Sequence, residues 1–233
     1  GTLFTKEAYQ LFKELELKSL FKYFDEEEKE EETLEVVTTS DLGEVENIFS
    51  SIKKSGRAGL GMIGVSGNCK GISLTWKEGT VLALIGGFVT EDYLKEKIVE
   101  LLKEGTELIV LDYKALLHFV EEVREYESQI QLQSAYDYED IARDYLRQML
   151  PSRKEICGKK AIEEVFEAEE EKTVQMAAYL SYVPFHAYPL VLEKLKEQEM
   201  EELYLTIERP TVATLYDMEK YGITVEKDAL KEY

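Results

Sequence analysis

The sequence has few of the residues that form disulfides in small secreted domains or that bind zinc. Its 233 residues include only two cysteines, Cys69 and Cys157, which are far apart and belong to no C-x-x-C pair. Two separated thiols fit a reducing cytoplasm better than a disulfide scaffold. The only two histidines, His118 and His186, stand at unhelpful spacing, so we do not expect a structural zinc site.

Basic residues are also scarce, and long apolar runs are missing. Lys and Arg together number 28 against 48 Asp and Glu, a formal net charge of -20. Such a surface repels phosphate backbones, so this segment alone should bind nucleic acid poorly, although a local basic strip or another domain could still hold DNA. No apolar run approaches the ~18 residues that span a bilayer. The N-terminus lacks the basic and then apolar regions of a secretion signal, so we expect a cytoplasmic protein without a membrane partner.

The sequence does have a hydrophobic content of 44%, enough for a sizeable core. Its patterns predict a helix over 3–24, an acidic linker over 25–32, a strand over 34–39, a helix over 40–55, an antiparallel meander over 57–87, a helix over 90–105 and a strand over 106–112. Every later segment is predicted helical, over 114–126, 138–150, 160–182, 187–207 and 210–222, with a break at Pro184 and Pro189. This order indicates an α/β or α+β domain, a mixed sheet with helices on it.

Three glycines in the meander, Gly59, Gly61 and Gly64, spell G-x-G-x-x-G, the fingerprint of dinucleotide sites. That site needs a strand before the motif and a helix after it, so that the pyrophosphate lies on the helix N-terminus. Here a predicted helix ends at Gly56, just before the motif, and a turn and another strand follow it. Because the context is inverted, we do not expect a nucleotide cofactor.

Both ends of the chain resemble segments of bacterial DNA polymerase I (family A). Residues 3–20, L-F-T-K-E-A-Y-Q-L-F-K-E-L-E-L-K-S-L, resemble the junction before its 3′–5′ exonuclease-like domain. Residues 207–225, I-E-R-P-T-V-A-T-L-Y-D-M-E-K-Y-G-I-T-V, resemble the opening of its polymerase domain. The resemblance implies an α/β fold of the ribonuclease H-like class (DnaQ-like exonuclease), a mixed β-sheet flanked by helices. It also implies a lead-in and acidic linker over 1–32, the exonuclease-like domain over 33–207 and the start of the polymerase domain over 208–233.

Active members of that family hold two divalent ions with carboxylates, which hard cations prefer. The resemblance places the family's D-x-E motif on Gly61 and Ile63, its second-motif Asp on Leu116, and the Asp of its Y-x-x-x-D motif on Val183. Tyr179 of the last motif is retained, but none of the other four residues can bind a metal ion. The resemblance therefore implies no metal, no cofactor and no catalytic residue in this segment.

Other acids could have replaced the missing ligands. Asp112, at the end of a predicted strand, is the best candidate, but a helix N-cap is the simpler interpretation. The cluster of Asp137, Glu139 and Asp140 favours the dipole of a helix that begins there, and Glu167 to Glu171 read as a solvated face. Further groups have bland interpretations as buried or helix-face residues: Cys69, His118, His186, Trp76 and the tyrosines.

Three hypotheses follow from the sequence. The first is a non-catalytic 3′–5′ exonuclease-like domain of a DNA polymerase I that acts in replication and repair. It would support the polymerase domain, space it from the 5′-nuclease domain of the same chain, and meet DNA only through the parent enzyme. The second is an active metal-dependent exonuclease with relocated carboxylates. The third is a stand-alone acidic interaction module.

Overall fold

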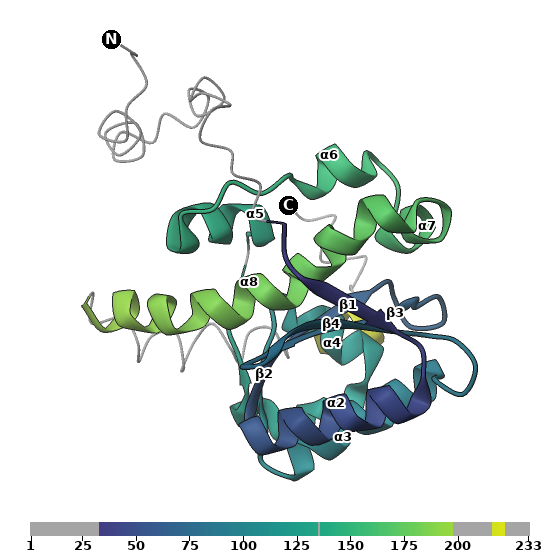
Figure 1. The fold of residues 1–233 in the computed structure, drawn as a ribbon. Coiled ribbons are helices and arrows are strands. Elements are labelled where there is room, and N and C mark those ends of the chain that lie inside the picture. Colours follow the sequence, from purple (N-terminus) through teal and green to yellow (C-terminus); the bar gives the residue numbers. More distant parts are fainter. Residues whose placement is uncertain (1–32, 135, 198–215, 222–233) are drawn as a thin grey trace, which may run out of the picture. The chain divides into compact units, whose positions relative to one another are not determined.

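The structure is a computed structural model that describes residues 33–134, 136–197 and 216–221 (Figure 1). The helix predicted over 3–24 and the acidic linker predicted over 25–32 lie outside the described residues, as do the end of the helix predicted over 187–207 and the residues around Pro210. The helix predicted over 210–222 is seen only over 216–221, where the chain is helical.

A six-stranded sheet forms the centre of the domain, with the order β1-β4-β3-β2-β5-β6. The strands are β1 (Val36–Thr39), β2 (Arg57–Ile63), β3 (Gly71–Trp76), β4 (Gly79–Leu84), β5 (Glu107–Ile109) and β6 (Ile130–Gln131). β2, β3 and β4 form the predicted antiparallel meander, whereas β1, β5 and β6 each pair in parallel. The result is the mixed sheet flanked by helices that the sequence predicted.

Successive side chains of β2 point to opposite faces of the sheet, because a strand has a side-chain period of two. Ala58 and Leu60 belong to the hydrophobic cluster that includes α2 (Leu42–Ser55) and α3 (Glu91–Lys103). Ile63 belongs to the cluster around α8 (Glu170–Glu197) on the other face. Figure 1 shows α2 and α3 below the sheet and α8 above it. Both faces of the central strand are therefore buried.

The helices on the α2 and α3 face begin and end at the residues that the sequence indicated. The Asp41 side chain caps the first turn of α2 and the Thr90 side chain caps that of α3. Gly56 ends α2 in the left-handed conformation with φ 78°, which glycine adopts without a steric penalty. These local signals predicted the first and last residues of both helices to within two residues.

The predicted break at Pro184 and Pro189 is wrong, because α8 runs through both prolines. A proline removes one helical hydrogen bond and strains the preceding turn. Helix α8 nevertheless continues through both prolines, since it packs along β2, β3 and β4. Tertiary packing here outweighs the local preference for a break.

Other predicted boundaries in the helical half are also wrong. The segment after Tyr113 forms α4 (Tyr113–Phe119), a 3-10 helix η3 (Glu121–Gln129), α5 (Tyr138–Ile141), a π-helical turn η4 (Ala142–Leu146), α6 (Arg153–Cys157) and α7 (Ile162–Ala168). β6 was missed although Ile130 and Leu132 alternate with glutamines, and α6 was missed although Ser152 and Glu155 form a capping box. The single helix predicted over 160–182 is divided at Glu169, where the backbone leaves helical geometry (φ -142°, ψ 63°).

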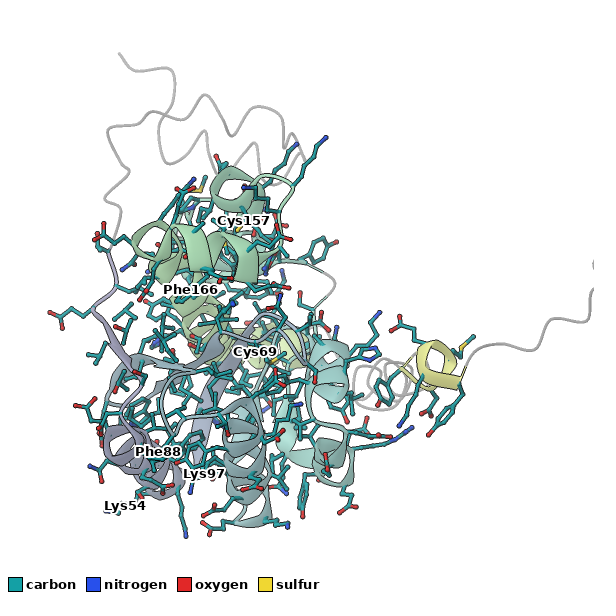
Figure 2. The ribbon with its side chains drawn as sticks, turned by 90° about the vertical axis from the view of Figure 1, so that its right-hand side faces the viewer. Lys54, Cys69, Phe88, Lys97, Cys157 and Phe166 are labelled. Atoms are coloured by element: carbon teal, nitrogen blue, oxygen red, sulfur yellow. The ribbon has the colours of Figure 1, made fainter. Side chains whose placement is uncertain are left out.

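The described residues include no helix that is both long enough and apolar enough to cross a bilayer. The two cysteines are buried and free, and they lie on different parts of the fold (Figure 2). Cys69 precedes β3, and Cys157 is the last residue of α6.

Candidate functional site

A cleft of about 440 Å³ opens where β2 meets the loop after β5 and the helices α6 to α8. Its wall is formed by Leu60, Gly61, Met62, Gly64, Val65, Val110, Leu111, Asp112, Ala115, Ser134, Tyr136, Asp137, Arg153, Ile162, Glu163 and Leu180. The three acids and one arginine in this wall come from four separate elements or loops. The cleft is therefore the place in the described residues where polar side chains converge beside the central strand.

Helix α8 approaches β2 so closely at the cleft that the strand has glycines, Gly59 and Gly61, where it faces the helix. A methyl group added at Gly61 would lie under 3.0 Å from the Leu180 Cβ and 3.1 Å from the Leu180 carbonyl oxygen. At Gly59 it would meet the Ser181 carbonyl and lie 2.9 Å from the Phe185 Cβ. Real Cβ atoms essentially never come that close. Glycine is therefore required at both positions by the contact between helix and strand.

Pro184 of α8 follows this contact in the chain. It has no N–H to donate to the carbonyl of Leu180, four residues earlier. The Leu180 carbonyl is among the α8 atoms that lie nearest to Gly61 on β2.

Most of the positions that the resemblance assigned to metal ligands lie on this face of the sheet. Gly61 is in the cleft wall, whereas Ile63 and Val183 are fully buried in the cluster around α8. The retained Tyr179 is buried in the same cluster, with its ring 5.5 Å from that of Tyr138. Leu116 differs, because it is buried in the cluster on the α2 and α3 face and Ala115 lines the cleft instead.

Asp112 lines the cleft and caps α4. Its carboxylate accepts a hydrogen bond of 2.9 Å from the backbone N–H of Ala115, the arrangement of a helix N-cap. The structure therefore shows Asp112 as a helix N-cap, the simpler of its two interpretations.

A second acid of the cleft, Asp137, is paired with an arginine that the sequence analysis did not single out. Arg153 of α6 donates from Nε to one carboxylate oxygen at 2.7 Å and from its terminal nitrogen to the other at 3.1 Å. Burial alone would raise the pKa of Asp137, but the hydrogen bond and charge of Arg153 outweigh it and lower the pKa. A lowered pKa means that the pair stabilises the fold at neutral pH and that this contribution is lost as falling pH protonates Asp137.

The third acid of the cleft, Glu163 of α7, was also missed. It is 8% exposed, and its Cβ is 3.1 Å from where a side chain on Gly64 would begin. Its sequence context, I-E-E-V-F, is that of any amphipathic helix. No local signal separates it from its exposed neighbour Glu164, because its burial depends on how α7 packs near β2.

The remaining candidates lie away from the cleft wall. Burial raises the pKa of Cys69 to about 11, which opposes formation of a reactive thiolate. His118 pairs with Glu219, and the His186 ring packs against Tyr182 at 4.4 Å. Trp76 is buried in the core, as predicted.

The residues of the cleft do not fit the pair of divalent ions that active members of the resembling family hold. Among residues 33–134, 136–197 and 216–221, no group of three or more His, Cys, Asp and Glu side chains is placed to hold a metal ion. Two of the cleft acids are already engaged, Asp112 with a backbone N–H and Asp137 with Arg153. At Gly61 there is no room for a carboxylate.

No protein-family model and no curated protein sequence matches this chain. Among solved structures it is similar to the POL domain of Pol1 from M. smegmatis in complex with a DNA primer-template and dNTP, with a TM-score of 0.54 and 16% identity. That match covers 84% of this chain but only 34% of the Pol1 chain. The EXD2 exonuclease domain soaked in Mg and GMP also matches, at 16% identity over 68% of this chain and 93% of that one, with a TM-score of 0.28.

These comparisons concern the fold. The chain has an α/β fold like that of a DNA polymerase structure, and it spans about a third of that structure's length. The predicted fold class, a mixed sheet flanked by helices, is confirmed.

Proposed function

We propose that this chain is a non-catalytic 3′–5′ exonuclease-like domain of a DNA polymerase. Its role is architectural: it supports the polymerase domain and spaces it from an upstream 5′-nuclease domain in the same chain. In this proposal the parent enzyme is a DNA-directed DNA polymerase, and the domain itself performs no proofreading. DNA meets the parent enzyme and binds this acidic segment weakly or not at all.

The observation that carries the proposal is the contact between Gly61 and Leu180. In the resembling family, this strand position supplies the first metal-binding carboxylate. Here the backbone and Cβ of Leu180 fill the space that any side chain on Gly61 would need. Regaining the ligand would require α8 to move away from β2, and one substitution would not achieve this in a close-packed interior.

A second function, an exonuclease with relocated carboxylates, has one observation in its favour. Asp112, Asp137 and Glu163 line the same cleft, so three acids converge beside the strand. The engagement of the first two weighs against it, since a carboxylate that caps a helix or pairs with arginine must break that contact to bind a cation.

The test is a nuclease assay on the 233-residue chain. Single-stranded DNA labelled at its 5′ end is incubated with Mg²⁺ or Mn²⁺, beside the variants Asp112→Ala and Glu163→Ala. We expect no shortening of the DNA by any of the three proteins, while an active 3′–5′ exonuclease in parallel shortens it. Metal-dependent shortening that disappears in either variant would overturn the proposal in favour of relocated ligands.

Thermal unfolding with and without metal provides a second readout. A cation at 100 times its Kd stabilises a folded protein by about 2.7 kcal/mol, which would raise the Tm of a domain of this size by about 5–10 °C. We expect no such rise with Mg²⁺ or Mn²⁺. A specific rise that Asp112→Ala removes would reveal a metal site.

The reading frame of the native gene distinguishes the stand-alone module from the non-catalytic domain and from the exonuclease with relocated carboxylates. A frame that continues past Tyr233 into polymerase sequence excludes the module, and a frame that stops there excludes the polymerase domain.

A further inference from the structure

The short helical stretch of residues 216–221 lies on a surface formed by α4 and η3. This stretch is distant from the cleft residues in the sequence and differs from them in composition. Its first residue, Tyr216, is 3% exposed and belongs to the same hydrophobic cluster as Val120 and Val123. The Tyr216 ring lies 4.8 Å from the ring of His118 on α4. Figure 2 shows this helix, in yellow, at the edge of the domain.

Three ion-pair contacts surround the buried tyrosine. Arg124 of η3 binds both carboxylate oxygens of Asp217, each at 2.6 Å. The two oxygens of Glu219 are shared between Lys114 and His118, each at 2.8 Å.

A fourth ion pair has the opposite polarity: Lys220, within residues 216–221, pairs with Glu121 of η3. The hydrogen bonds from Arg124 and Lys114 lower the pKa values of Asp217 and Glu219, so both carboxylates are ionised at neutral pH. The helix therefore presents two acids to cations of the domain and one cation to an acid of the domain.

Residues 216–221 are joined to α4 and η3 by one buried aromatic side chain and by ion pairs of both polarities. The chain carries a formal net charge of -20, which disfavours bringing another acidic segment to its surface. Lys114 and Arg124 place two positive charges beside Glu219 and Asp217 and offset this repulsion there.

We propose that α4 and η3 form a docking surface that holds residues 216–221, which we term the latch, at one place on the domain. The tyrosine supplies the buried contact, and the bidentate Arg124–Asp217 pair sets the orientation, because a guanidinium fork and a carboxylate match in one plane. A role of the latch as the joint to a following polymerase domain rests on the proposed function. The docking of the latch on α4 and η3 does not rest on that function.

The experiment measures amide hydrogen exchange of residues 216–221 in the full 233-residue chain. Arg124→Glu should speed exchange there about tenfold or more, because it replaces a bidentate attraction by a repulsion. Asp217→Arg should do the same, and the double variant with both charges exchanged should return the rate to within about threefold of the parent. Lys103→Glu, an equal charge change at an exposed residue of α3, is the matched control and should leave these amides unchanged.

Protection in β2 and β3 reports whether each variant is folded, so a loss confined to residues 216–221 cannot come from global unfolding. Raising the salt concentration from about 0.05 M to about 1 M should also speed exchange in the latch, since salt screens exposed ion pairs. Unchanged exchange in Arg124→Glu, or a loss that the charge exchange does not reverse, overturns the proposal. The result is independent of nuclease activity, so failure of the latch and failure of the proposed function are distinguishable.

Discussion

The two faces of the central sheet are covered in different ways. On the α2 and α3 face, aliphatic side chains from both layers meet, as Leu60 and Leu74 do with the buried residues of α3 in one cluster. On the α8 face, the helix backbone comes down to two glycines of β2. Beside them, the Ser181 hydroxyl bonds to Ser73 and, at 2.8 Å, to Thr75.

This difference bears on the proposed function, because the resembling nucleases keep their acids on the face that α8 covers here. On a face packed by large side chains, shortening one of them leaves a cavity but the helix can keep its place. A face packed backbone to backbone leaves no room for a side chain, and each substitution there must move a helix. If the proposed function is right, loss of the carboxylates and close approach of α8 belong to one structural state.

The strongest test of this difference between the two faces is to place an acid at Gly61. Gly61→Asp would place a Cβ in contact with Leu180 and bury an unpaired charge, two of the changes that destabilise most. We expect a loss of about 4 kcal/mol or more in the free energy of unfolding, a large part of the total for a domain. Urea denaturation followed by circular dichroism measures it.

The matched control is Gly43→Asp on α2, an exposed glycine in the first turn of a helix. The helix dipole favours an acid there, whereas the Asp41 carboxylate, 3.2 Å from where the side chain would begin, disfavours it, so we expect a change within about 1 kcal/mol. Gly61→Ala separates the steric part from the charge and should fall between the two. A Gly61→Asp protein as stable as the parent would show that α8 can move, and would return the relocated or restored nuclease to consideration.

On the opposite face, a large side chain carries the packing, so shortening one is the equivalent test. Ile98 of α3 is fully buried, and Ile98→Ala should lower the free energy of unfolding by about 2–5 kcal/mol through lost burial and a cavity. Glu96→Ala, two residues away on the exposed side of the same helix, should change it by about 0.5 kcal/mol or less. A loss under about 1 kcal/mol at Ile98 would mean that this face relaxes as readily as a surface.

The two faces also differ in how much the sequence could predict. The α2 and α3 face rests on local signals: the caps Asp41 and Thr90, the terminator Gly56, and apolar residues at helical spacing. Each signal acts within a few residues, so the elements could be placed from sequence. The order of the meander was accessible for the same reason, since its turns are short.

The α8 face depends on contacts between distant segments, which no local pattern encodes. Pro184 signals a break that packing on the sheet overrides. Arg153 and Glu163 reach the cleft from helices about 40 and 50 residues after Asp112, and nothing in their own neighbourhood marks them. The resemblance gave the register of α4, but the structure was needed to see that Ala115 rather than Leu116 lines the cleft.

The smallest expected effect concerns the hydroxyl contacts between α8 and β3. Ser181→Ala removes the hydrogen bonds to Ser73 and Thr75, but Thr75 keeps a bond of 2.8 Å to Thr80. Because most of the network stays satisfied, we expect a loss of only about 1 kcal/mol in the free energy of unfolding.

A double-mutant cycle isolates this contribution. Thr75→Ser keeps the hydroxyl and should show little coupling to Ser181→Ala, whereas Thr75→Val removes it and should show a coupling of about 0.5 kcal/mol or more. Ser55→Ala, at the exposed end of α2, controls for the loss of a hydroxyl from a helix. If Ser181→Ala proved as harmful as Ile98→Ala, the hydroxyls and not the glycine contacts would be what holds α8 to the sheet. The contrast between the two faces would then be one of polarity, not of distance.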